Sequence, residues 1–214
     1  MKLIDLSVRE FVYEVDSAKP APGGGSVSAV SAALGTGLLR MIGHLTIPKK
    51  KFGKLDEEIQ DRYIKTHESL KSLEKTLLDL VDKDTDAFNG IMDAFKLPKE
   101  TDQEKKKRKK AIESATIKAI EVPEGIADVA YEALKKVDFI RQYGNKNAIS
   151  DVGVSALMLY SGLEGACLNI KINLSGVSDE QVKKMYSEKV EAMIHDAKIV
   201  QRNILDAIHK SLEV

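Results

Sequence analysis

Apolar residues recur at every third or fourth position along most of the chain, which is the spacing of one face of an α-helix. Two long stretches, 54–89 and 177–214, contain neither Gly nor Pro and are rich in Leu, Glu, Lys and Ala. These residues favour helices. No run of alternating polar and apolar β-branched residues lies between turn signals, so no strand is predicted.

The predicted helices begin and end near the prolines, which interrupt the helical pattern. The first helix opens at Ser7, where Glu10 completes a capping box, and it ends before residues 19–25. The second covers 26–46. Further helices are predicted at 54–96, 101–120, 123–142, 148–171 and 178–212. The predicted fold is therefore all-α, a bundle of long antiparallel helices that forms a single domain over residues 1–214.

The second predicted helix is apolar enough to be compared with a membrane span. Arg40 and His44 interrupt the apolar stretch, and Ser and Gly dilute it, so a buried helix of a soluble protein is the better interpretation. Ala29, Ala33 and Gly37 recur at four-residue spacing and let another backbone approach closely. This spacing predicts tight helix packing, either within the chain or across a dimer.

The charge and composition of the chain argue against a nucleic-acid partner. The 214 residues include 33 basic and 33 acidic ones, so the net charge is zero and no general affinity for nucleic acid follows. The basic runs 49–51 and 104–110 are interpreted as a turn and a solvated helix face, with anion binding as the alternative. Few aromatic residues flank either run, which again argues against a nucleic-acid partner.

The single cysteine, Cys167, excludes an internal disulfide framework and a cysteine-based zinc cluster. The segment MKLIDLSVRE is too polar for the apolar core of a signal peptide. We therefore expect a cytoplasmic protein with no membrane partner. The four histidines match no metal-ligand spacing, so no metal site is expected, and His67 is placed at the edge of its helix's apolar face.

One acidic residue interrupts the apolar stripe of the helix predicted at 54–96. The stripe consists of Leu70, Leu73, Leu77, Leu80, Val81, Phe88, Ile91 and Phe95. Asp84 lies within it, whereas Asp82 and Asp86 point to nearly the opposite side at about 100° per residue. A carboxylate on an apolar face must be paired, hydrogen-bonded or shifted in pKa, and such groups are enriched at functional sites. Asp84 is thus a candidate functional residue, and a structural ion pair or helix–helix hydrogen bond is the alternative.

Glycines precede the second predicted helix. The sequence Pro22-Gly23-Gly24-Gly25-Ser26 opens directly onto it, so free backbone N–H groups and the positive end of the helix dipole meet there. This arrangement suits an anion or a polar ring edge. A plain flexible turn is the alternative, since neither a P-loop nor a GxGxxG motif is present.

A polar turn, residues 144–151, leads into the helix predicted at 148–171. Ser150 and Asp151 stand at the beginning of that helix. They are candidate site residues, but Ser and Asp are also ordinary residues of a helix N-terminus, and that structural role is the alternative.

Several motifs occur together in an order that resembles one family. They are Pro20-Ala-Pro-Gly-Gly-Gly-Ser26-Val, Leu45-Thr46 with Lys49-Lys50, Val81-Asp82-x-Asp84-x-x-Ala87-Phe88, Leu97-Pro98-Lys99, Gly144-Asn145 with Ser150-Asp151, and Asn169-Ile-Lys-Ile-Asn173-Leu174. Over nearly its whole length the chain resembles the cyclodeaminase/cyclohydrolase family, whose best known member is the cyclodeaminase half of formiminotransferase-cyclodeaminase. Pro48, Phe52 and Asp86 depart from the pattern of the bifunctional enzymes, which leaves substrate preference open.

The resemblance implies an all-helical homodimer that acts on tetrahydrofolate. The expected activity is that of a formimidoyltetrahydrofolate cyclodeaminase, which converts 5-formiminotetrahydrofolate to 5,10-methenyltetrahydrofolate and ammonia. No cofactor is expected beyond the tetrahydrofolate substrate. The alternatives are a methenyltetrahydrofolate cyclohydrolase, which uses water as the nucleophile, and a helical folate-binding module without turnover.

The resemblance also suggests roles for individual residues. Asp84 is expected to act as the catalytic acid or base or to stabilise the methenyl cation, and Asp151 is the second candidate catalytic carboxylate. The expected substrate-binding residues are Gly23, Gly24, Gly25, Ser26, Thr46, Lys49, Lys50, Lys99, Asn145 and Ser150. Among these, the glycine loop would donate backbone hydrogen bonds to the folate. The three lysines would hold a single or polyglutamylated tail.

Overall fold

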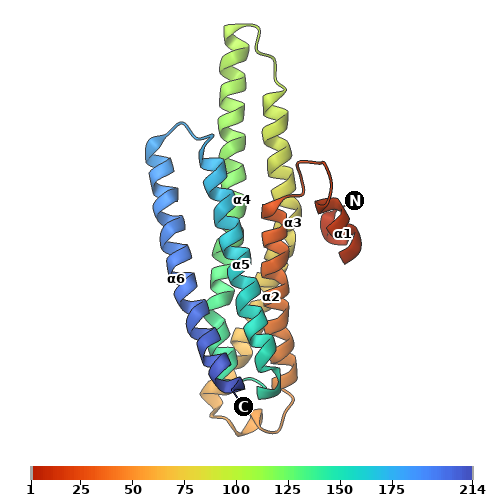
Figure 1. Ribbon diagram of the computed structural model, residues 1–214, viewed down its shortest axis with the longest axis vertical. Coiled ribbons are helices and arrows are strands. Elements are labelled where there is room, and N and C mark those ends of the chain that lie inside the picture. The colour runs from red at the N-terminus through yellow and green to blue at the C-terminus, as the bar shows by residue number, and fades with distance from the viewer. Residues whose placement is uncertain (1, 214) are drawn as a thin grey trace.

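A computed structural model describes residues 2–213, and these residues form helices and no strands. The α-helices are α1 (Val8–Val15), α2 (Gly24–Thr46), α3 (Glu57–Phe95), α4 (Asp102–Tyr143), α5 (Ile149–Leu174) and α6 (Glu180–Leu212); the short 3-10 helices are η1 (Leu3–Asp5), η2 (Phe52–Lys54) and η3 (Lys146–Ala148). Helices α2 to α6 run alternately up and down in one bundle, and the hairpin of α3 and α4 projects beyond the other helices (Figure 1). The prediction of an all-α antiparallel bundle is confirmed.

Two capping boxes fix where helices begin. Ser7 Oγ accepts a hydrogen bond from the backbone N–H of Glu10 at 3.3 Å, and Glu10 Oε2 accepts one from the N–H of Ser7 at 2.8 Å. Thr101 and Glu104 make the same pair of bonds at the start of α4, at 3.2 and 2.8 Å. These bonds satisfy N–H groups that have no partner inside the helix. The predicted first helix is therefore confirmed at its start.

The predicted break at Pro123 is wrong, because α4 continues through this proline. A proline inside a helix removes the N–H that would bond to the carbonyl four residues earlier. Here that carbonyl belongs to Ala119, and it accepts a hydrogen bond from Asn173 Nδ2 of α5 at 2.6 Å. A side chain from the neighbouring helix thus replaces the lost backbone donor, and the two predicted helices form one.

Small residues bring α2 and α5 close together at the centre of the bundle. Ser155 Oγ donates a hydrogen bond to the carbonyl of Gly35 at 2.7 Å. A Cβ atom on Gly162 would lie only 2.9 Å from the backbone nitrogen of Ala32. Tight packing of α2 therefore occurs within the chain, but through Ala32 and Gly35 rather than through the whole predicted stripe. Gly37 of that stripe faces α3 instead, where its Cβ would lie 3.3 Å from Glu74 Oε1.

The apolar character of α2 fits its place in the bundle. By length and composition α2 could cross a membrane, but 56% of its most apolar window is buried inside the protein. Leu39 and Ile42 of this helix are fully buried. Together with Leu70, Leu134 and Leu159 from α3, α4 and α5, they form part of the hydrophobic core.

Candidate functional site

The glycine-rich start of α2 lies directly against Asp84 of α3. Asp84 Oδ2 accepts hydrogen bonds from the backbone N–H of Ser26 at 2.8 Å and from Ser26 Oγ at 3.1 Å. A Cβ atom on Gly25 would lie 2.0 Å from Asp84 Oδ1, a distance that real Cβ atoms do not reach. Gly25 therefore has a steric reason to be glycine, because it lets the carboxyl reach the first turn of α2.

Burial and hydrogen bonding act on Asp84 in opposite directions. Burial raises the pKa of this carboxyl, and the two hydrogen bonds from Ser26 offset the rise only in part. The bonds from Ser26 of α2 to Asp84 of α3 confirm the helix–helix hydrogen bond that was predicted as an alternative role for this carboxyl. No residue in the range 2–213 donates a hydrogen bond to its second oxygen, Oδ1. A partly buried carboxyl with a raised pKa and an unoccupied oxygen is chemically suited to exchange a proton with a ligand.

The neighbouring acidic residues differ from Asp84, as the helical spacing predicts. Asp82 Oδ1 accepts a hydrogen bond from the backbone N–H of Leu3 at 2.6 Å and so holds the N-terminal segment to α3. Asp86 is exposed. On the other side of α2, a Cβ atom on Gly24 would lie 3.0 Å from Asn169 Nδ2. The start of α2 therefore lies between a carboxyl group of α3 and an amide group of α5.

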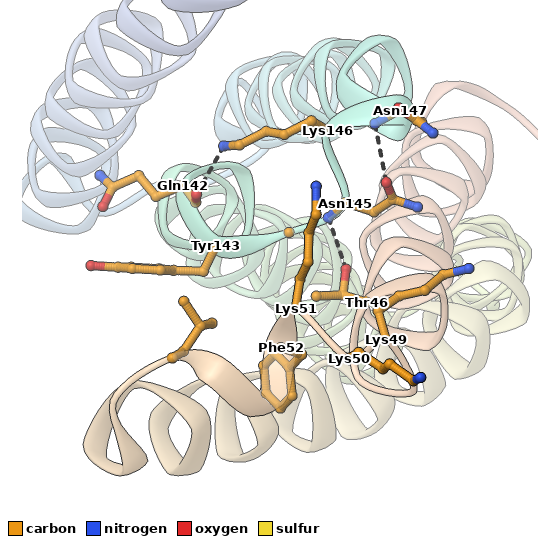
Figure 2. A pocket seen from close by; sticks show the side chains of 12 residues that line it. Thr46, Lys49, Lys50, Lys51, Phe52, Gln142, Tyr143, Asn145, Lys146 and Asn147 are labelled. Atoms are coloured by element: carbon orange, nitrogen blue, oxygen red, sulfur yellow. Dashed lines mark hydrogen bonds between the residues drawn. The ribbon is translucent and has the colours of Figure 1, made fainter.

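A second cluster of predicted residues lines a cavity of about 550 Å³ at the other end of α2 (Figure 2). Its lining comes from the turn after α2, from η2, and from the turn between α4 and α5. The residues are Thr46, Lys49, Lys50, Lys51, Phe52, Leu55, Gln142, Tyr143, Gly144, Asn145, Lys146 and Asn147. The lining contains four lysines and no acidic residue, so the cavity favours a ligand with several negative charges. We refer to it as the lysine pocket.

Hydrogen bonds hold the turn that forms one wall of the lysine pocket. Thr46 Oγ1 accepts a hydrogen bond from the backbone N–H of Asn145 at 2.9 Å and donates one to the carbonyl of Ile42 at 2.6 Å. Asn145 Oδ1 accepts one from the N–H of Asn147 at 3.1 Å. Lys146 Nζ donates to two carbonyls at the end of α4. The hydroxyl of Thr46 is therefore occupied in positioning Asn145.

Lys49, Lys50 and Lys51 are exposed on the turn after α2. None of the ion pairs in the described part of the chain involves any of these three lysines. Their ammonium groups are therefore available to an anionic ligand. Lys146 joins the basic run 49–51 at this pocket, because the two turns come together only in the folded protein.

The structure groups the predicted site residues in separate places. Asp84 and residues 23–26 form one cluster, and Thr46, Lys49, Lys50 and Asn145 line the lysine pocket. Thr46 follows Ser26 by twenty positions in α2, so about 30 Å separates the two clusters at 1.5 Å per residue.

Three further predicted residues lie outside both clusters. Ser150 and Asp151 occupy the first turn of α5, and neither lines the lysine pocket. Asp151 precedes Asn169, which contacts Gly24, by eighteen residues of helix or about 27 Å, so one chain does not bring Asp151 to Asp84. Lys99 follows α3 at the projecting tip, so the expectation that it joins Lys49 and Lys50 is not met within one chain.

Two buried residues of α3 were not identified as site residues. Tyr63 is fully buried, and its ring lies 5.3 Å from that of Phe52. His67 is 3% exposed, so its placement at the edge of the apolar face is wrong. The signal was available, because Tyr63, His67 and Leu70 extend the apolar stripe of α3 at helical spacing. Within residues 2–213 no group of three His, Cys, Asp or Glu side chains is arranged to hold a metal ion.

Comparisons with known proteins give a consistent result along nearly the whole chain. The family model described as formiminotransferase-cyclodeaminase matches residues 7–192. A methenyltetrahydrofolate cyclohydrolase of Methylorubrum extorquens is 32% identical over 94% of this chain and 95% of that protein. The formimidoyltransferase-cyclodeaminase of Rattus norvegicus is 33% identical over 99% of this chain, which spans only 38% of the rat protein. The crystal structure of a formiminotetrahydrofolate cyclodeaminase from Thermotoga maritima superposes with a TM-score of 0.79 at 27% identity, covering 95% of this chain and 98% of that one.

Proposed function

We propose, because the chain belongs to the formiminotransferase-cyclodeaminase family, that it converts 5-formiminotetrahydrofolate to 5,10-methenyltetrahydrofolate and ammonia. The chain is structurally similar to a formiminotetrahydrofolate cyclodeaminase and covers 98% of it. This similarity supports the proposal. The observation that carries it on the chemical side is Asp84, a carboxyl whose pKa is raised by burial at the glycine-rich start of α2.

The reaction requires one proton to move between two nitrogen atoms. N10 of the folate attacks the carbon of the protonated formimino group, and N10 loses its proton. The amino nitrogen on that carbon gains a proton and leaves as ammonia, so the methenyl cation remains. A carboxyl with a raised pKa can accept the first proton and donate the second. In its ionised form Asp84 would also stabilise the cationic product.

The glycine-rich turn beside Asp84 fits a polar ligand. In the described chain, the backbone N–H of Ser26 bonds to Asp84, and the N–H of Val27 bonds to the carbonyl of Gly23. The N–H groups of Gly24 and Gly25 precede these and lie at the positive end of the α2 dipole. They would donate hydrogen bonds to the folate. Folate binding at this turn is part of the proposal.

The lysine pocket fits the glutamate tail of a folate. The tail carries one carboxylate for each glutamate and one more at its end, and four lysines line the pocket. Opposite charges without competing acidic side chains favour such a ligand. Lys99 lies on the projecting tip and takes this role only if a second chain brings it close.

A methenyltetrahydrofolate cyclohydrolase is the second candidate. The observation in its favour is the 32% identity with a protein of that name, over nearly the full length of both chains. The same pocket and cation would serve, with water attacking the methenyl carbon in place of N10. Asp84 would then accept a proton from water.

A homodimer is part of the proposal, because apolar side chains remain exposed on α1, α2 and α5. Leu34 is 57% exposed, Leu168 61% and Ile172 69%, and Val8 of α1 is 85% exposed. Val8 and Leu34 line one surface depression, and Leu168 and Ile172 line another. Exposed apolar surface of this kind is typical of protein interfaces. Light scattering should give twice the 23.6 kDa mass of the chain. A mass equal to one chain at micromolar concentration would contradict the dimer.

One pair of reactions tests the activity. The purified protein is mixed with 5-formiminotetrahydrofolate, and the methenyl chromophore and free ammonia are followed together. A second mixture contains methenyltetrahydrofolate alone, in which loss of the chromophore is followed. Equal gains of chromophore and ammonia support the cyclodeaminase, and loss in the second mixture alone supports the cyclohydrolase. No change in either mixture, relative to the Asp84→Asn variant, would refute both.

A further inference from the structure

A groove between α2 and α5 begins at the glycine-rich start of α2. Its volume is about 600 Å³, which lies within the range of pockets that hold small molecules. Both helices contribute to its lining, which consists of Gly24, Val27, Ser28, Ser31, Ser161, Gly165, Leu168, Asn169 and Ile172. The side chains of Val27, Leu168 and Ile172 are exposed and give the groove apolar walls. Apolar walls with a few polar groups are typical of small-molecule sites. We refer to this feature as the α2–α5 groove.

Asn169 supplies the α2–α5 groove with a hydrogen-bond acceptor. Its Nδ2 donates to the carbonyl of Gly165 at 2.8 Å, and this bond fixes which end of the amide faces its own helix. Within residues 2–213 no group donates a hydrogen bond to its oxygen, Oδ1. Ser28 differs, because its hydroxyl hydrogen goes to the carbonyl of Gly24 at 2.6 Å. The oxygen of Asn169 is therefore suited to accept a hydrogen bond from a ligand in the groove.

Asn169 and Asp84 lie on either side of two consecutive glycines. A Cβ atom on Gly24 would lie 3.0 Å from Asn169 Nδ2, and one on Gly25 would lie 2.0 Å from Asp84 Oδ1. Since consecutive Cα atoms are 3.8 Å apart, the amide and the carboxyl are separated by at most about 12 Å. A fused two-ring heterocycle with its first substituent spans a distance of this order. One ligand can therefore contact both side chains.

We propose that the α2–α5 groove holds the pterin ring of the folate and that Asn169 Oδ1 accepts a hydrogen bond from the 2-amino group of this ring. The amino group lies at the opposite end of the ring system from the reacting N5 and N10. An anchor at Asn169 therefore directs these two nitrogens across Gly24 and Gly25 toward Asp84. The groove opens on the face proposed for the dimer, so a bound ring would lie beside the second chain. This inference rests on the proposed function, because it assigns the groove to the folate.

The test removes this hydrogen bond from each of its two ends. Calorimetry measures the Kd of the protein for tetrahydrofolate and for its 2-desamino analogue, which lacks the amino group. We expect the wild type to bind the analogue about tenfold more weakly, the loss of one hydrogen bond of ordinary strength. Asn169→Ala should weaken the binding of tetrahydrofolate by a similar factor, and loss of the amino group should then change its Kd no further. Asn203→Ala, at an exposed position on α6, should behave as the wild type.

Two further variants separate recognition of the ring from folding and from binding of the tail. Asn169→Asp keeps an acceptor oxygen, so it should still prefer tetrahydrofolate to the analogue. Lys49→Gln with Lys50→Gln should weaken both ligands equally and leave the ratio of their Kd values unchanged, because the lysine pocket is a separate place. Thermal unfolding checks that each variant is folded.

Two outcomes would overturn the assignment of the ring. One is an equal Kd of the wild type for the two ligands, and the other is a preference for tetrahydrofolate that persists in folded Asn169→Ala. In both cases, binding of tetrahydrofolate by the wild type would leave the proposed function standing. If the wild type binds neither ligand, the proposed function fails, and the role of Asn169 falls with it.

Discussion

The bond between Asn173 and the carbonyl of Ala119 explains how α4 continues through Pro123, and it can be tested quantitatively. Ala119 is 6% exposed, so its carbonyl has little access to water. The N–H that would normally reach it is missing, because residue 123 is proline. Asn173 Nδ2 donates to this carbonyl at 2.6 Å from the neighbouring helix. Removing the amide would leave a buried acceptor without a partner.

The expected magnitude follows from this geometry. We expect Asn173→Ala to lower the free energy of unfolding by about 1–3 kcal/mol, the cost of an unsatisfied buried acceptor. In a Pro123→Ala background the backbone N–H of residue 123 becomes available to the same carbonyl. Asn173→Ala should then cost much less, and the coupling between the two positions should be about 1 kcal/mol or more.

Chemical denaturation followed by far-ultraviolet circular dichroism gives the four free energies of unfolding that the cycle needs. All four proteins are measured at one concentration, since association would shift apparent stability. Asn169→Ala is the matched control, because Asn169 Nδ2 donates to Gly165 of its own helix at 2.8 Å and makes no bond to α4. Equal costs of Asn173→Ala with and without Pro123 would refute this account of the continuous helix.

Three further predictions follow from the site. Gly25→Ala should lower the free energy of unfolding by about 1–3 kcal/mol through overpacking, because the new Cβ would lie 2.0 Å from Asp84 Oδ1. Gly90→Ala should stabilise α3 by up to about 1 kcal/mol, because no atom lies within 4 Å of the new Cβ. Thermal unfolding of both variants distinguishes steric conflict from helix propensity. Burial raises the pKa of Asp84 above its ordinary value of 3.8, so the folded state binds this proton more tightly than the unfolded state. The folded protein should therefore become less stable as the pH rises from 3.8 through the raised pKa. Unfolding measured from pH 3 to 8 should show this loss in the wild type and not in Asp84→Asn, and parallel curves would contradict the raised pKa. Lys49→Gln with Lys50→Gln should weaken binding of a triglutamylated folate and reduce the salt dependence of its Kd; an unchanged salt dependence in calorimetry would show that the tail binds elsewhere.

Much of the fold could be predicted from the sequence, because the signals involved are local. The capping box of Ser7 and Glu10 and the long stretches without Gly or Pro depend only on neighbouring residues, and the corresponding helices are present. The continuation of α4 could not be predicted in this way. It depends on Asn173, which lies fifty residues away from Pro123 in sequence and meets α4 only through tertiary packing.

The site was predictable to the same extent. Helical spacing alone placed Asp84 toward another helix, and the structure adds the reason that Gly25 is needed there. The lysine pocket combines two turns that are nearly a hundred residues apart, since the N–H of Asn145 bonds to Thr46. Sequence spacing carries no information about such a meeting, so Lys146 was not identified as a site residue.

The separation of the two clusters bears on how the proposed dimer would work. Within one chain, about 30 Å of α2 lies between Asp84 and the lysine pocket, and each holds only part of what the proposed reaction needs. An isologous dimer places the same surface of both chains face to face. If the exposed apolar side of α2 and α5 is that surface and the two-fold axis crosses α2, the start of one α2 comes level with the end of the other. A carboxyl that exchanges protons and a pocket that holds the tail would then meet at each end of the interface. The dimer proposed from the exposed apolar residues thus also accounts for functional groups that a single chain keeps apart.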